Sequence, residues 1–154
     1  KETGKTFIAN SKLKANYFSK FVNFSVISDD SGLCIKSLNN KPGVYSARLA
    51  KKKGGFTNAM KYLLKKLEKK KNRSATFICC LSFKSPNQKI INVVGQIKGT
   101  ISKEILGKKG FGYDPIFIPK NRRKTFGEIP KFKKMKMDHR FIAFRKLKKR
   151  VKIL

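Results

Sequence analysis

The segment Thr76–Phe83, with the sequence TFICCLSF, decides the expected fold of this 154-residue chain. Its side chains are apolar almost without interruption, which is typical of a central strand covered on both faces. A second candidate strand, Lys89–Ile97, follows after Ser85-Pro86-Asn87-Gln88, a sequence suited to a hairpin turn. Upstream, Phe24–Ser28 and Leu33–Leu38 are predicted to be two short strands with a turn-like stretch between them.

Three helices are expected around these strands. Apolar residues recur at roughly the helical period within Ile8–Lys20, at Ile8, Leu13, Tyr17 and Phe21. Thr57 is predicted to cap a second helix, and Asp138 a third, whose apolar face carries Phe141, Phe144, Leu147 and Val151. The order of these elements, without repeats or a Ser/Gly linker, predicts one α/β domain over residues 1–154. We expect a mixed, twisted β-sheet flanked by helices.

The charge of the chain is extreme. Lys and Arg number 39 against 8 Asp and Glu, giving a formal net charge of +31. Such a balance is typical of proteins that bind nucleic acid or an anionic surface. A basic nucleic-acid-binding module is therefore one hypothesis, carried by the runs at 51–53, 65–66, 69–71 and 146–152. Against it, the runs lie on separate elements with few aromatic residues between them, and Lys, Ile, Asn and Phe are also what an AT-rich genome encodes. We expect nucleic-acid binding to be incidental.

Several classes of protein are excluded or disfavoured. No apolar run approaches the ~20 residues that span a bilayer, and no secretory signal pattern is present, so no membrane partner is expected. The three cysteines, Cys34, Cys79 and Cys80, lack metal-ligand spacing. They are predicted to be reduced, buried thiols in a cytoplasmic protein.

The eight carboxylates are more informative than the lysines, because most of them lie in loop-like segments. Asp29-Asp30-Ser31-Gly32 would put two diverging carboxylates at a strand end, one able to hold a metal and the other to take a proton. Phe111–Pro115 combines aromatic side chains with a carboxylate, and His139-Arg140 opens a helix where an anion could bind. Taken singly, each motif also fits an ordinary turn, a packed loop or a structural histidine.

Together, the motifs resemble one family in their order. They are Glu2-Thr3-Gly4, Leu13-Lys14-Ala15, Asp29-Asp30-Ser31-Gly32-Leu33, Pro42-Gly43-Val44-Tyr45-Ser46-Ala47-Arg48, Gly110-Phe111-Gly112-Tyr113-Asp114-Pro115, Thr125-Phe126-Gly127-Glu128, Lys134 and His139-Arg140. The chain is similar, over nearly its whole length, to the noncanonical purine nucleoside triphosphate pyrophosphatases. These enzymes share an inosine triphosphate pyrophosphatase/Maf-like fold and hydrolyse inosine, deoxyinosine and xanthosine triphosphates.

The resemblance implies Mg²⁺-dependent cleavage between the α- and β-phosphates, which releases a monophosphate and pyrophosphate. It implies that Asp30 is the general base and a metal ligand, with Asp29 and Glu2 as further metal ligands. Lys14, in a catalytic role, and Lys134 would neutralise triphosphate charge. The residues implied to line the nucleotide site are Ser31, Phe111, Gly112, Tyr113 and Asp114, with His139 and Arg140 reading the 6-oxo edge of the base. A homodimer is also implied.

Two departures from the family pattern affect these expectations. The family begins with a strand and a phosphate-gripping loop that contains Asn and Lys, and this chain starts at Lys1, just before the Glu2-Thr3-Gly4 motif. We therefore expect a domain that is incomplete at the N-terminus, with an inactive truncated remnant as an alternative to an enzyme. The family's Ser before His-Arg is Asp138 here, which would cap the helix equally well.

Overall fold

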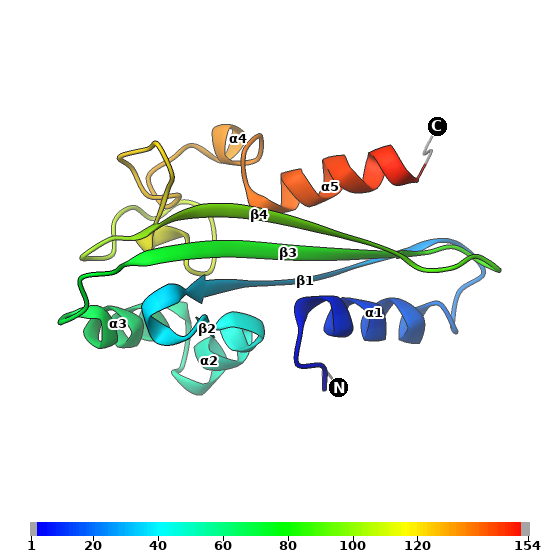
Figure 1. Cartoon of the computed structure of the whole chain (residues 1–154), viewed down its shortest axis with the longest axis horizontal. Helices are drawn as coiled ribbons and strands as arrows, with labels where there is room; N and C mark the ends of the chain where they lie inside the picture. The colour runs from blue at the N-terminus through cyan, green and yellow to red at the C-terminus, as the bar shows by residue number, and fades with distance from the viewer. Residues whose placement is uncertain (1–2, 152–154) are drawn as a thin grey trace.

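The computed structural model describes residues 3–151, which form a five-stranded sheet with helices on both sides (Figure 1). The strands, in the order β2-β1-β3-β4-β5 across the sheet, are β2 Lys41–Pro42, β1 Val26–Ile35, β3 Ser74–Lys84, β4 Ile91–Ile101 and β5 Phe117–Pro119. The α-helices are α1 Phe7–Phe18, α2 Ser46–Lys52, α3 Phe56–Leu67, α4 Lys131–Lys134 and α5 His139–Arg150. Short 3₁₀ turns lie at η1 Lys36–Leu38, η2 Gly43–Tyr45 and η3 Asp114–Ile116.

The expected architecture of a sheet flanked by helices is confirmed, but the strand pairing differs. All pairings between the strands of residues 3–151 are antiparallel, whereas we expected a mixed sheet. The β3–β4 hairpin, which the sequence predicted, is confirmed and pairs from Ser74↔Thr100 to Phe83↔Ile91. The chain between β1 and β3 forms α2 and α3 and returns to the sheet end that it left, so that β3 runs antiparallel to β1.

β1 is one continuous strand of ten residues, which corrects the prediction of two short strands. The aspartates lie inside it, with Asp29 paired to Leu81 and Asp30 to Cys80 of β3. The hydrogen-bonded pairing with β3 therefore keeps Asp29–Gly32 in a strand, although its composition is typical of a turn. Gly32 allows the close approach of the next segment, because a Cβ at that position would lie 2.3 Å from the Gly43 carbonyl oxygen.

Two apolar clusters hold the helices to the sheet. One joins α3 to β1 and β3 through residues such as Leu63, Leu33 and Phe77, and the other joins α5 to β3 through Leu147 and Leu81. The N-cap of α3 is Gly55, not the predicted Thr57. The predicted cap of α5 is confirmed, since Asp138 Oδ1 accepts a hydrogen bond from the Phe141 N–H at 2.9 Å. Within the predicted apolar face of α5, Phe144 is exposed and Leu147 is buried.

α1 forms where the periodicity predicted a helix, but it packs through a different face. Most of its large apolar side chains are exposed, namely Ile8, Leu13, Tyr17 and Phe18. The buried residues are Asn10, Ser11 and Ala15. These side chains are small or polar, and hydrogen bonds to the sheet take the place of apolar packing.

The contact between α1 and the sheet is built on buried hydroxyls. Ser11 Oγ donates to Ser82 Oγ at 2.7 Å, and Ser28 Oγ donates to the Ser11 carbonyl at 2.6 Å. Ser82 Oγ in turn donates to Asn92 Oδ1 at 2.7 Å. Each of these groups is buried or partly buried. Removing the partner of any one of them should therefore lower the free energy of unfolding, because a buried polar group would be left without its hydrogen bond.

Replacing Ser11 with Ala should lower the free energy of unfolding by roughly 1–3 kcal/mol, because it removes the buried hydrogen bond that Ser82 Oγ accepts from the Ser11 hydroxyl. Urea titration followed by circular dichroism measures the change. Ser19→Ala is the matched control on the same helix, since the Ser19 hydroxyl makes an exposed hydrogen bond to the Asn16 carbonyl at 3.1 Å. Equal effects of the two substitutions would contradict a stabilising role for the buried hydroxyls.

The predicted state of the cysteines is confirmed: Cys34, Cys79 and Cys80 are free and buried. Burial, followed by the nearby Asp29 carboxylate, raises the pKa of Cys79 to about 12, so this thiol is protonated at neutral pH. Within residues 3–151, none of the helices combines the length and the apolar character that crossing a membrane requires.

Candidate active site

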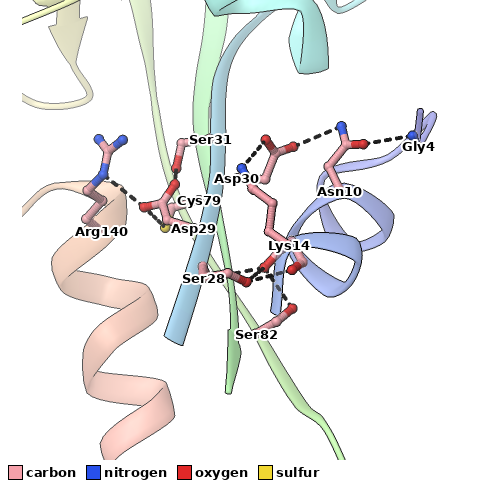
Figure 2. Close-up of polar contacts among 11 residues, drawn as sticks. Gly4, Asn10, Lys14, Ser28, Asp29, Asp30, Ser31, Cys79, Ser82 and Arg140 are labelled. Atoms are coloured by element: carbon pink, nitrogen blue, oxygen red, sulfur yellow. Dashed lines mark hydrogen bonds and ion pairs between the residues drawn. The ribbon is translucent and has the colours of Figure 1, made fainter. Parts of the chain in front are cut away.

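The two adjacent aspartates of β1 lie on opposite faces of the sheet (Figure 2). Successive residues of a strand alternate in direction, so Asp30 faces α1 and Asp29 faces α5 (Figure 2). The expectation that the two carboxylates diverge is therefore confirmed, although in mid-strand and not at a strand end. Each carboxylate has its own set of partners.

Asp30 is held between two side chains of α1. It pairs with Lys14 Nζ at 3.3 Å through Oδ1 and accepts a hydrogen bond from Asn10 Nδ2 at 3.3 Å through Oδ2. Asn10 is itself oriented, because its Oδ1 accepts the Gly4 N–H at 2.8 Å (Figure 2). The structure thus brings together Asp30 and Lys14, the two residues for which the resemblance implied a catalytic role. A buried carboxylate held beside a lysine is the kind of side chain that can accept a proton as a general base.

Asp29 orients an arginine. Its Oδ2 accepts Arg140 Nε at 3.0 Å and lies 3.3 Å from the Cys79 thiol, while Oδ1 accepts the Ser31 hydroxyl at 2.5 Å (Figure 2). With three donors, Asp29 is occupied on the face of the sheet away from Asp30. Asp29 therefore positions the Arg140 guanidinium.

A divalent ion would find one suitable carboxylate among the described residues at the α1 face. Within residues 3–151 no group of three or more His, Cys, Asp or Glu side chains could hold a metal. Glu2, another predicted ligand, lies outside the described residues. Mg²⁺ is commonly bound by only one or two carboxylates together with water and substrate phosphates, so Asp30 fits an ion that arrives with a triphosphate.

A pocket opens beside Arg140. Its walls come from β1, the start of α2, α3, β3, the loop before η3 and the start of α5. The lining residues include all the predicted nucleotide-site residues except Lys134: Ser31, Phe111, Gly112, Tyr113, Asp114, His139 and Arg140. Ser46, Phe56 and Phe77 also line it and were not predicted as site residues. Phe77 belongs to the apolar run of the central strand, a pattern that indicates only a core, and Phe56 lies in none of the motifs, so no sequence signal marked either as a site residue.

The aromatic residues at this pocket have different roles. Tyr113 is buried, donates its hydroxyl to the Ser46 carbonyl at 2.9 Å and has its pKa raised to about 12 by burial. Phe111 is 57% exposed, and the Arg140 guanidinium lies 4.8 Å from its ring centroid. Phe111 is therefore accessible to a planar ligand, whereas Tyr113 stabilises the pocket wall through its hydrogen bond to Ser46.

Lys134 lies behind this pocket in a buried ion cluster. Its Nζ is 2.7 Å from Asp114 Oδ2 and 3.8 Å from Asp138 Oδ2. Asp114 Oδ2 also accepts the Phe111 N–H at 2.8 Å, so the cluster holds the aromatic loop. Burial raises the pKa of Asp114, and the hydrogen bond from Lys134 opposes this rise. With both carboxylates close to it, Lys134 stabilises the loop; its predicted contact with a triphosphate stays a prediction.

His139 is buried, and its ring stacks on Phe77 with centroids 4.8 Å apart and an interplanar angle of 8°. Burial, followed by the charges of Arg140 and Lys134, lowers the pKa of His139 to about 3, so the ring is neutral. Arg140 Nη1 lies 3.3 Å from Nε2, and a guanidinium can only donate. Nε2 is therefore the acceptor, and the proton sits on Nδ1, a buried atom without a hydrogen-bond partner among residues 3–151.

The neutral state of His139 predicts a pH dependence of stability. Its pKa is lower in the folded chain than the ordinary 6.5, so the unfolded state binds the extra proton and stability falls as the pH drops below 6.5. At pH 5 this linkage should cost roughly 2 kcal/mol relative to pH 7.5. His139→Gln should show a smaller loss over the same interval in urea titrations. An identical loss in the variant would contradict a neutral, buried histidine.

Asp30 and Lys14 form an ion pair, and the pocket nearby has an exposed aromatic ring and an arginine held by Asp29. This arrangement suits a planar compound that carries anionic groups. The sequence profile of the Ham1 family matches residues 1–150, and the chain belongs to this family.

Similar proteins agree with this assignment. The dITP/XTP pyrophosphatase of Bacillus subtilis (strain 168) is 46% identical over 151 residues, which cover 96% of this chain and 76% of the relative. The dITP/XTP pyrophosphatase of Borreliella burgdorferi (strain ATCC 35210) is 46% identical over 159 residues, or 97% and 78% of the two chains. The structure of the Staphylococcus aureus Ham1 protein matches with a TM-score of 0.93 at 37% identity, covering 99% of this chain and 79% of that one. The resemblance found in the motifs is thereby confirmed.

Proposed function

We propose that this protein hydrolyses noncanonical purine nucleoside triphosphates, such as ITP, dITP and XTP, to the monophosphate and pyrophosphate. The observation that carries the proposal is that two adjacent residues of β1 hold the two parts of the site: Asp30 pairs with Lys14 of α1, and Asp29 pairs with Arg140 of α5, which lines the pocket. Chains 46% identical to this one carry the name dITP/XTP pyrophosphatase.

The pocket provides hydrogen-bond donors for the base. Arg140 lines the pocket, and its guanidinium N–H groups can only donate hydrogen bonds, while the Nδ1–H of neutral His139 is buried within the pocket wall. A 6-oxo purine presents an acceptor at this edge, whereas adenine presents a donor and would leave these groups unpaired. Phe111 supplies an exposed ring face for stacking. These features support a preference for deaminated purines over ATP.

The catalytic step is assigned to the α1 face. Water adds to phosphorus, the bond between the α- and β-phosphates breaks, and the proton of the water passes to Asp30. Lys14, 3.3 Å from Asp30, is close enough to offset phosphate charge. Mg²⁺, when bound, would neutralise charge on the phosphate oxygens. Asp30 and Glu2 are the proposed ligands, while Asp29 is assigned to Arg140.

The test is pyrophosphate release from ITP, XTP, dITP and ATP in the presence of Mg²⁺ and after chelation with EDTA. We expect kcat/KM for the 6-oxo substrates to exceed that for ATP by at least about 100-fold, because adenine leaves buried donors unpaired. We also expect release to stop with EDTA. Equal rates with ATP would contradict the specificity. A cooperatively folded chain that releases no pyrophosphate from any substrate would favour the alternative of an inactive remnant.

We further propose that the protein acts as a cytoplasmic homodimer, supported by the family resemblance and by its buried, reduced cysteines. Sedimentation equilibrium at micromolar concentration tests the oligomeric state. A mass near twice the 17.6 kDa of the chain is expected, and a monomer mass would contradict the proposal.

A further inference from the structure

A second hollow in the surface shares no lining residue with the pocket described above. It lies where β1 and β4 end and β3 begins, and the segment after β5 forms its rim. We call it the basic groove; its lining residues include Cys34, Lys36, Asn40, Ser74, Thr76, Lys98, Thr100, Ile118, Lys120, Asn121 and Arg122. Cys34 pairs with Thr76 and Thr76 with Lys98, so the floor is one face of three adjacent strands.

Four cations border this groove: Lys36, Lys98, Lys120 and Arg122. All four side chains are exposed, and the lining residues include no carboxylate. The remaining polar residues are hydroxyls and amides, such as Thr76, which can bond to phosphate oxygens. Positive charge without opposing charge, in a concave surface, concentrates anions.

The composition of the groove also indicates the kind of anion. None of its lining residues is aromatic, so bases would find no stacking platform. Its cations come from three separate parts of the chain, at Lys36, at Lys98 and at Lys120–Arg122, an extent that suits several phosphates in a row. A flexible single-stranded nucleic acid can enter the basic groove. A rigid duplex can contact only the edge of the groove.

We propose that the basic groove binds the phosphodiester backbone of single-stranded nucleic acid without sequence preference. The groove cations lie outside the lysine runs at 51–53, 65–66, 69–71 and 146–152 that suggested nucleic-acid binding in the sequence. The proposal therefore differs from a general attraction of a +31 chain for polyanions. The site is independent of the pyrophosphatase reaction.

The experiment compares two variants that lose the same number of positive charges. In the groove variant, Lys36, Lys98, Lys120 and Arg122 are changed to Gln. In the control variant, Lys51, Lys52, Lys148 and Lys149, all exposed and outside the groove, are changed to Gln. Fluorescence anisotropy with a labelled single-stranded DNA oligonucleotide measures Kd over a range of salt concentrations, and circular dichroism checks that both variants are folded.

We expect the groove variant to bind at least about tenfold more weakly and its salt slope to fall by about 3, near 0.7 for each lost phosphate contact on a single strand. The control variant should keep most of the affinity, and hydrolysis of ITP should be the same in both. Equal losses in the two variants would overturn the proposal, as would tighter binding of a duplex of the same sequence. Binding to vesicles of anionic phospholipid but not to the oligonucleotide would also overturn it.

Discussion

Asp30→Asn should lower kcat for pyrophosphate release from ITP by about 10²–10⁴-fold, the range lost when a general base is removed. The amide keeps the size of the side chain but cannot take the proton, and it no longer forms the 3.3 Å ion pair with Lys14. KM should change much less, because Asp30 does not line the pocket for the base. Steady-state kinetics with a coupled pyrophosphate assay measures both constants.

The matched control is the neighbouring Asp29→Asn. This substitution removes the ion pair that holds Arg140 Nε at 3.0 Å and leaves Asp30 and Lys14 in place. We expect its main effect to be a higher KM for ITP and a weaker preference for ITP over ATP. If the two substitutions lowered kcat equally, the assignment of the catalytic step to the α1 face would be wrong.

Lys134→Met should lower the free energy of unfolding by roughly 3–5 kcal/mol, the cost of leaving buried carboxylates without their cation. Asp114 is 1% exposed, and its 2.7 Å contact with Lys134 is the shortest ion pair among the described residues. Methionine keeps the length of the side chain, so the loss reports charge and hydrogen bonding. Urea titration of the unfolding transition measures it.

Two further variants separate this effect from a general loss of packing. Lys133→Met, at the exposed neighbouring position, should change stability by less than about 0.5 kcal/mol. Adding Asp114→Asn to Lys134→Met should recover part of the loss, because the unpaired charge is removed. The cost of Lys134→Met should also grow from acidic to neutral pH: without Lys134 to oppose burial, the folded pKa of Asp114 is raised, and stability is lost as the pH rises through it. A cost that is independent of pH would contradict this explanation.

The Asp138 substitution in the family motif can now be explained structurally. Asp138 caps α5 through Oδ1, and its Oδ2 lies 3.8 Å from Lys134 Nζ. The carboxylate is therefore held near a buried ammonium group. Sequence reasoning predicted the cap, but the ion pair depends on the position of α4 relative to α5.

Much of the candidate site was predictable because short motifs carry its residues. Asp29, Asp30 and Ser31 are consecutive, so their relation to one another is settled by the strand alone. The same is true of the loop at Phe111–Asp114 and of the His139-Arg140 pair. Phe56 and Phe77 escaped prediction, because an apolar residue that lines a pocket has the same sequence pattern as one in the core.

The helix of residues 7–18 shows where local pattern stops being informative. Apolar spacing predicted the helix correctly, yet the face carrying Leu13 and Tyr17 is exposed and the face carrying Ser11 is buried. Whether a face is buried depends on what lies opposite it. Here the opposite surface presents the hydroxyls of Ser28 and Ser82, which only the folded sheet brings together.

The central strand Thr76–Phe83, the hairpin that follows it and the ordered family motifs were determined by the sequence itself, because each depends on residues a few positions apart. The tertiary structure decided that Asp29–Gly32 continues a strand, that Lys134 is buried, and that cations from three separate segments meet in one groove. These features depend on contacts between residues dozens of positions apart. Such contacts are selected by burial and strand pairing in the whole fold, and no local stretch of sequence encodes them.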